Sequence, residues 1–187
     1  MHTYTMEVAG LKRDLPVCKV TDDLHIGAFV IYGDVELTEA CARDLLKLVP
    51  ADSYDYMLTA AAKSIPLIYE MARQSGAAKY FVALKGPKVY MKDPLVVRDK
   101  SITTAGEQKL YLDGVEADMI RGKRILLVDD VISTGGSIHA LEELVKQAGG
   151  IVVDRIAILA EGAAAQRTDI KFLAPLPLFN ADGTVKG

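Results

Sequence analysis

Two adjacent carboxylates, Asp129 and Asp130, stand directly after the apolar run 125–128 and before a turn rich in glycine and hydroxyl groups. Carboxylates accept hydrogen bonds from hydroxyl groups, and the backbone amides of a glycine-rich turn at a helix start bind phosphate. A ligand with vicinal hydroxyls beside a phosphate, such as a ribose 5-phosphate, fits this order of residues. The alternative is a buried strand followed by two solvated aspartates and an ordinary turn. The turn consists of Ser133, Thr134, Gly135, Gly136 and Ser137.

The flanking sequence predicts the elements that position these residues. Residues 125–128 are β-branched or leucine without a polar interruption, which is typical of a strand buried on both faces of a parallel sheet. After the turn, apolar residues recur at helical spacing until Gly149 and Gly150, which predict the helix end. These apolar residues are Ile138, Leu141, Leu144 and Val145.

The order of strand, acid pair, turn and helix over residues 125–137 resembles the 5-phosphoribosyl-1-pyrophosphate (PRPP) binding motif of type I phosphoribosyltransferases. The resemblance implies that Asp129 and Asp130 hold the ribose hydroxyls and that the turn holds the 5-phosphate. A Walker-type nucleotide loop is disfavoured, because the chain contains no G-x-x-x-x-G-K-[ST] sequence.

The same resemblance implies a pyrophosphate loop at residues 59–64, ahead of a helix in which Pro66 occupies the first turn. Lys63 is the expected pyrophosphate contact, and the alternative is a solvated lysine at a helix start. The loop departs from the acid-x-basic-Gly arrangement common in the family, since it has Ala61 and Ser64 at the acid and glycine positions.

A second basic segment resembles the Arg-Lys-x-x-Lys sequence of adenine phosphoribosyltransferases, with Leu84 at the arginine position. The resemblance implies that Lys85 and Lys88 contact pyrophosphate, and that one such basic residue reaches the partner's site in a homodimer. It further implies Asp129, Asp130 and Lys85 as the catalytic set. Mg²⁺ is expected to arrive through PRPP, with no direct protein ligand.

Phe29, Tyr32 and Glu161 are candidates for contacts with the base, although packing in the core is the alternative role for Phe29 and Tyr32. The mobile loop of adenine enzymes often carries Glu-Tyr-Gly. That triplet is absent here, and residues 104–107 lie near its place.

Composition limits the class of protein. The chain has 187 residues, half of them apolar, which is enough for one domain with a sizeable core. A formal charge of −3 provides no basic field for a polyanion, so nucleic acid is not an expected partner. Cys18 and Cys41 lack metal-ligand spacing and are expected to be reduced thiols. No apolar run approaches the roughly 18 residues of a membrane span, so we expect no membrane association and a cytoplasmic location.

The expected fold class is α/β, with a type I phosphoribosyltransferase-like parallel sheet flanked by helices, a small N-terminal and C-terminal hood, and a long flexible loop. We expect one domain, with residues 1–35 as a hood segment, 36–174 as the core and 175–187 as a C-terminal hood segment. The charged segment 85–121 predicts a short β-ribbon with strands at 95–97, 101–104 and 109–112, and residues 92–109 as a lid. The other predicted elements are helices at 37–49 and 65–73 and strands at 54–58, 80–84 and 151–160.

Over nearly its whole length the chain is most similar to the adenine branch. This similarity implies transfer of phosphoribose from PRPP to a purine base in purine salvage, and adenine is the expected base. Two alternatives stay open. One is a phosphoribosyltransferase for xanthine or hypoxanthine, and the other is a PRPP-binding regulatory sensor without catalysis, which the departures at Ala61 and Leu84 favour.

Overall fold

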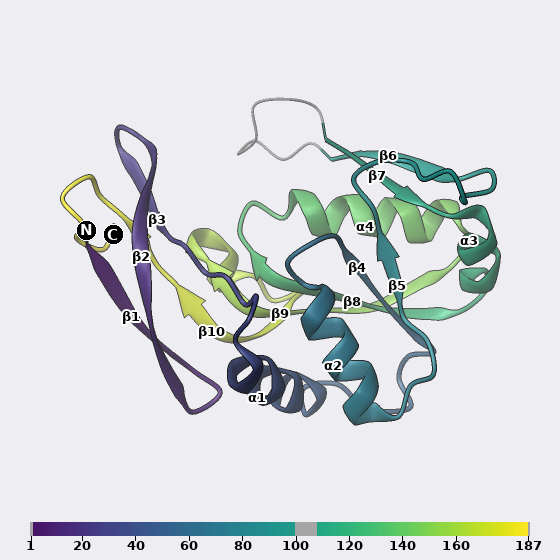
Figure 1. Ribbon diagram of the computed structural model, residues 1–187, viewed down its shortest axis with the longest axis horizontal. Helices are drawn as coiled ribbons and strands as arrows, with labels where there is room; N and C mark the ends of the chain where they lie inside the picture. The colour runs from purple at the N-terminus through teal and green to yellow at the C-terminus, as the bar shows by residue number, and fades with distance from the viewer. Residues whose placement is uncertain (1, 100–107, 187) are drawn as a thin grey trace.

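A five-stranded parallel sheet forms the centre of the computed structural model, which describes residues 2–99 and 108–186 (Figure 1). Its strand order is β10-β9-β8-β4-β5, and every neighbouring pair is parallel. The predicted α/β fold class is therefore confirmed. The strands are β4 (Tyr56–Ala60), β5 (Phe81–Ala83), β8 (Arg124–Ile132), β9 (Ile151–Glu161) and β10 (Lys171–Leu176).

The order of the strands creates a switch point between β4 and β8. From β4 the chain passes to β5 on one side, and it then returns to β8 on the other side of β4 before continuing outward to β9 and β10. The connections that leave the carboxyl ends of β4 and β8 therefore diverge to opposite faces of the sheet. In open α/β sheets, ligands bind in the crevice at such a point.

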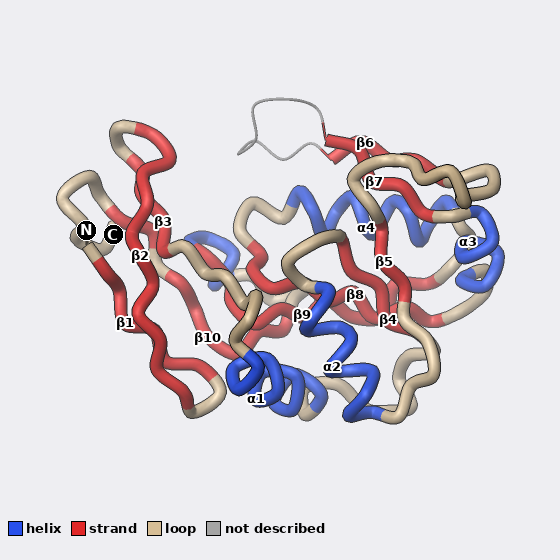
Figure 2. The backbone as a smooth tube through the Cα atoms, viewed as in Figure 1, coloured by secondary structure: helices blue, strands red, loops and turns tan. Residues whose placement is uncertain are grey.

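Helices lie on both faces of the sheet (Figure 2), and one apolar layer packs against each face. Helices α1 (Val35–Leu46) and α2 (Ile65–Ser75) pack on one face, and α4 (Gly136–Gln147) packs on the other. The α4 layer also contains α3 (Gly114–Ile120) and the antiparallel ribbon of β6 (Leu95–Asp99) and β7 (Gln108–Leu112). Within β8, Ile125 and Leu127 face the α4 layer, whereas Leu126 and Val128 face the α1–α2 layer. This strand is therefore buried on both faces, as its apolar run predicts.

A separate antiparallel sheet, called the hood here, stands beside the core and carries both ends of the described chain (Figure 1). Its strands are β1 (Thr3–Val8), β2 (Leu11–Thr21), β3 (Leu24–Gly27) and β11 (Leu178–Phe179), in the order β1-β2-β3-β11. The hood thus combines the two chain ends that the sequence assigns to it. Strand β10 continues to Leu176, two residues beyond the predicted end of the core at 174.

Three element predictions need correction. Helix α3 lies inside the segment 85–121, for which the sequence predicted a β-ribbon and no helix was named, and β4 ends at Ala60 where the sequence predicted residue 58. Strand β8 runs to Ile132, so it includes the acid pair. The predicted strand 101–104 lies outside the described residues, as do residues 100–107 of the predicted lid 92–109. None of the helices in the described chain is long and apolar enough to cross a membrane.

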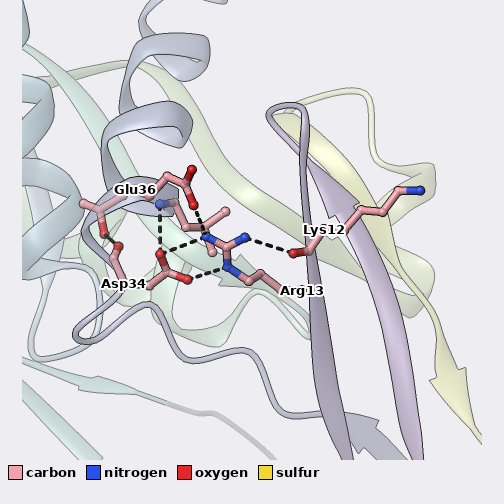
Figure 3. A network of polar contacts seen from close by, with 6 residues as sticks. Lys12, Arg13, Asp34 and Glu36 are labelled. Atoms are coloured by element: carbon pink, nitrogen blue, oxygen red, sulfur yellow. Dashed lines mark hydrogen bonds and ion pairs between the residues drawn. The ribbon is translucent and has the colours of Figure 1, made fainter.

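A polar contact joins the hood to the core at the start of α1 (Figure 3). Arg13 of β2 donates from Nε to Asp34 Oδ2 at 2.6 Å and from Nη2 to Glu36 Oε2 at 2.8 Å. Asp34 is also the N-cap of α1 and accepts from the backbone N–H of Leu37 at 3.0 Å. The Arg13 guanidinium holds the pKa of Asp34 below its ordinary value. One carboxylate therefore both caps a core helix and binds the hood.

Asp34→Ala removes the cap and the two hydrogen bonds that Arg13 donates to this carboxylate, from Nε at 2.6 Å and from Nη2 at 3.1 Å. We expect the free energy of unfolding to fall by about 1 to 2 kcal/mol, most of it from the lost N-cap bond, because part-exposed ion pairs contribute little. Urea denaturation would report this as a lower midpoint at an unchanged slope.

Asp22→Ala is the control, because the Asp22 side chain is 91% exposed and pairs with Lys19 at the surface. Its expected change is below about 0.5 kcal/mol. Equal losses in the two variants would contradict a specific role for Asp34.

Candidate functional site

The acid pair lies at the switch point, at the place where β8 loses its neighbour on one side. Pairing between β8 and β4 ends at Leu127, whereas pairing with β9 continues through Asp129 to Ile132. Asp129 is 8% exposed and Asp130 is 3% exposed. The two carboxylates are thus buried in the part of β8 that no longer pairs with β4, and the interpretation as solvated aspartates is wrong.

The connection after β4 supplies a cation to the acid pair. Lys63 Nζ lies 2.8 Å from Asp130 Oδ2, with the Lys63 side chain 47% exposed. Burial alone would lower the pKa of Lys63, but the attraction of Asp130, followed by that of Asp129 and Glu161, raises it. Lys63 is therefore a charged residue beside the acid pair that keeps about half of its side chain exposed, and its contact with pyrophosphate stays a prediction.

Burial and the neighbouring charge of Asp130 raise the pKa of Asp129. Both causes disfavour the ionised form, because a carboxylate loses hydration on burial and two like charges repel each other. Hydrogen bonds from the Ser64 hydroxyl and the Asp130 backbone N–H act in the opposite direction. The ionisation of the pair therefore depends on donors that surround it.

The predicted phosphate turn forms a small cavity at the start of α4. All five turn residues line a cavity of about 140 Å³, together with Asp129, Val131, Ile132 and Ile138. Gly135 is the N-cap of α4 at φ +85°, and within the described residues no side-chain hydrogen bond caps this helix end. The first amides of α4 are thus free of a side-chain acceptor, which is the arrangement that an anion needs.

A second cavity, of about 280 Å³, adjoins the first and shares Asp129, Val131 and Ser137 with it. Lys63 and Lys85 line this second cavity together with Asp130. Lys88 is exposed and is not among the lining residues. The structure therefore brings Lys63, Lys85, the acid pair and the phosphate turn together, and it leaves Lys88 outside.

The three candidate base contacts have different surroundings. Phe29 is 5% exposed and packs in the α1–α2 layer, as the core alternative predicts, whereas Tyr32 is 47% exposed. Glu161 ends β9 and is 8% exposed. Burial raises the pKa of Glu161, while a hydrogen bond with Ser133 and the charge of Lys63 lower it. Only Glu161 is therefore linked to the turn and to Lys63.

Two residues near the site were not singled out by their sequence. Ser64 contacts both aspartates across 65 and 66 positions of the chain, which no local pattern indicates. Arg167 lies so close to Gly135 that a Cβ built there would be 2.6 Å from Arg167 Nη1. For α3, in contrast, a local signal exists, because Asp113 and Glu116 form the spacing of a capping box.

The described residues contain no group of three or more His, Cys, Asp or Glu side chains that could hold a metal ion. Mg²⁺ binding through a phosphate ligand stays a prediction.

The comparison with protein families identifies a phosphoribosyl transferase domain over residues 41–174. Among curated proteins, the hypoxanthine/guanine phosphoribosyltransferase of Methanotorris igneus is 29% identical over 154 residues, covering 80% of each chain.

Similar folds occur among solved structures. The adenine phosphoribosyltransferase of Thermoanaerobacter pseudethanolicus matches with a TM-score of 0.63 at 22% identity, over 78% of this chain and 83% of that chain. The adenine enzyme of Trypanosoma brucei, solved with AMP, pyrophosphate and ribose-5-phosphate, matches with a TM-score of 0.57 at 19% identity, over 78% and 67% of the two chains.

Gly135→Ala tests the phosphate turn. At φ +85° an alanine would be held in a left-handed backbone conformation that it disfavours, and its Cβ would collide with Arg167. We therefore expect the start of α4 to shift. The predicted result is an affinity for ribose 5-phosphate at least about tenfold lower, or roughly 1.4 kcal/mol, in titration calorimetry.

Gly122→Ala is the matched control, because Gly122 has φ +69° and a Cβ there meets no atom within 4 Å. It carries similar backbone strain away from the turn, so its affinity should stay unchanged. Equal loss of affinity in both variants would show that general destabilisation is responsible.

Proposed function

This chain belongs to the phosphoribosyltransferase family, and we propose that it transfers the 5-phosphoribosyl group of PRPP to a purine base with release of pyrophosphate. One observation carries the proposal. The buried acid pair lies between two cavities, one lined by the uncapped start of α4 and the other by Lys63 and Lys85. A ribose with phosphate groups at both of its ends matches this order of anion, hydroxyl and anion sites.

We assign each part of the donor to one group of residues. The turn of residues 133–137 binds the 5-phosphate through helix-start amides, and Asp129 with Asp130 accepts hydrogen bonds from the ribose hydroxyls. Lys63 and Lys85 bind the pyrophosphate. Lys63 pairs with Asp130, so pyrophosphate would have to share or take over this cation.

The proposed reaction breaks the bond between ribose C1 and a pyrophosphate oxygen and forms a bond between C1 and a base nitrogen, which loses its proton. Charge grows on the leaving pyrophosphate while C1 becomes oxocarbenium-like, as in glycoside chemistry. Lys63 and Lys85 would stabilise the leaving group, and the carboxylates would hold the ribose in place. Mg²⁺ bound to the phosphate oxygens would neutralise part of the same charge.

The acceptor base is proposed at two levels. A purine is supported by the named relatives. Adenine is the first candidate because the overall sequence resembles the adenine branch. Hypoxanthine or guanine is the second candidate, since the curated relative from M. igneus with 29% identity carries that name.

Turnover with a panel of adenine, hypoxanthine, guanine, xanthine and orotate tests both levels. We expect pyrophosphate release from PRPP with at least one purine and none with orotate. PRPP binding without turnover on any base would contradict the proposal and favour the regulatory sensor.

The variant Asp129→Asn with Asp130→Asn tests the ribose site. Amides replace two charged acceptors, and hydrogen bonds to charged groups contribute about 1.5 to 3 kcal/mol each, so PRPP affinity should fall by more than about a hundredfold. Unchanged binding in titration calorimetry would show that the acid pair does not hold the donor.

Lys63→Met tests the pyrophosphate site. Methionine keeps much of the side-chain volume but removes the charge, so pyrophosphate affinity should fall by at least about tenfold. Ribose 5-phosphate affinity should change less.

Lys79→Met is the control. This lysine precedes β5, so it lies at the amino ends of the strands, whereas the site lies at their carboxyl ends, and it pairs with Glu116. A similar loss in the Lys79 variant would reveal a general effect of charge.

A further inference from the structure

Ser64 lies at the start of α2, between the pyrophosphate loop and the acid pair, and it is 1% exposed. Serine at a helix N-cap ordinarily accepts a hydrogen bond from an amide of the first turn. The Ser64 hydroxyl makes no such cap bond. Its hydrogen-bonding capacity is directed elsewhere.

Three contacts use that capacity. Ser64 Oγ lies 3.0 Å from Asp129 Oδ1 and 3.3 Å from Asp130 Oδ1, so it can donate its single hydrogen to either carboxylate. It also accepts from the backbone N–H of Asp130 at 2.9 Å. The hydroxyl therefore holds β8 to the start of α2 through side chain and backbone together.

These contacts define which oxygens remain for a ligand. Asp129 Oδ1 accepts from Ser64 and also from the Asp130 backbone N–H at 2.9 Å. Within the described chain, Asp129 Oδ2 makes no hydrogen bond, and Asp129 lines both cavities of the site. With Oδ1 anchored, the free oxygen of Asp129 is the one available to a ribose hydroxyl.

We propose that Ser64 is a positioning residue for phosphoribosyl transfer, which fixes the acid pair relative to the pyrophosphate loop so that both halves of the donor bind in one geometry. This inference rests on the proposed function. Ser64 acts through Asp129 and Asp130, and it does not itself need to touch the substrate.

Charged groups around Asp129 make the pH dependence of binding a sensitive measure of this role. Asp130 on β8 and Glu161 at the end of β9 are negative, whereas Lys63 on the pyrophosphate loop and Lys85 after β5 are positive. Burial and Asp130 raise the pKa of Asp129, and the Ser64 hydrogen bond lowers it. Loss of the hydroxyl should therefore move protonation of Asp129 to higher pH.

Ser64→Ala is the test, with ribose 5-phosphate as the probe in titration calorimetry across pH 5 to 9. At the upper end of this range we expect affinity to fall by roughly tenfold, because the acid pair loses the hydrogen bond that fixes its orientation and must be ordered when the ligand binds. The pH below which binding fails should rise by about one unit. Protonation removes an acceptor from the ribose site, so binding weakens as the pH falls.

Two further variants separate positioning from folding. Ser64→Cys keeps nearly the same volume with a weaker donor, so it should fall between the wild type and Ser64→Ala, and it carries the test if the alanine variant does not fold. Ser75→Ala removes another hydroxyl of α2, whose bond is to the carbonyl of Ala72 at 3.3 Å, and should leave binding unchanged.

The outcomes are distinct. Wild-type affinity in both Ser64 variants would overturn the inference, as would a weaker affinity without any shift along the pH axis. If the wild type binds neither PRPP nor ribose 5-phosphate, the proposed function is wrong, and the inference about Ser64 is wrong as well.

Discussion

Asp129 and Asp130 bring two carboxyl groups together on a strand from which water is almost excluded, where ionisation is unfavourable unless donors and cations surround the pair. Lys63 supplies the cation at 2.8 Å, and the Ser64 hydroxyl with the Asp130 amide supplies the donors. The acid pair and the connection after β4 therefore depend on each other. A site for ribose hydroxyls exists only while this arrangement keeps a carboxylate charged and partly unpaired.

The strand order provides the space for that arrangement. Because β4 and β8 are neighbours whose following segments diverge, the 61–64 connection and the 133–137 turn border one crevice from two sides. The α4 helix start contributes amides without a side-chain cap, and the other side contributes Lys63 and Lys85. Two separate anion sites thus flank one hydroxyl site, at a spacing that the sheet fixes.

The hood depends on different interactions. Its apolar residues, such as Met6 and Leu15, join the same layer as α1 and α2, while Arg13 binds the capping carboxylate of α1. The hood is therefore packed on the core by burial, and the hydrogen bonds of Arg13 to Asp34 and Glu36 join it to the start of α1. Phe29, which follows β3, belongs to this packing, so its aromatic ring serves the connection between hood and core.

Much of this protein follows from the sequence by itself. Local signals identify β8, the glycine turn, α4 and the hood segments, because apolar periodicity and glycine act over a few neighbouring residues. The capping-box spacing at Asp113 would have identified α3 as well. The burial of the acid pair, the bonds of Ser64, the approach of Arg167 to Gly135 and the exclusion of Lys88 from the cavity were decided by the tertiary structure. These features join residues tens of positions apart, and the register of parallel strands and the packing of side chains, which no local pattern encodes, bring them together.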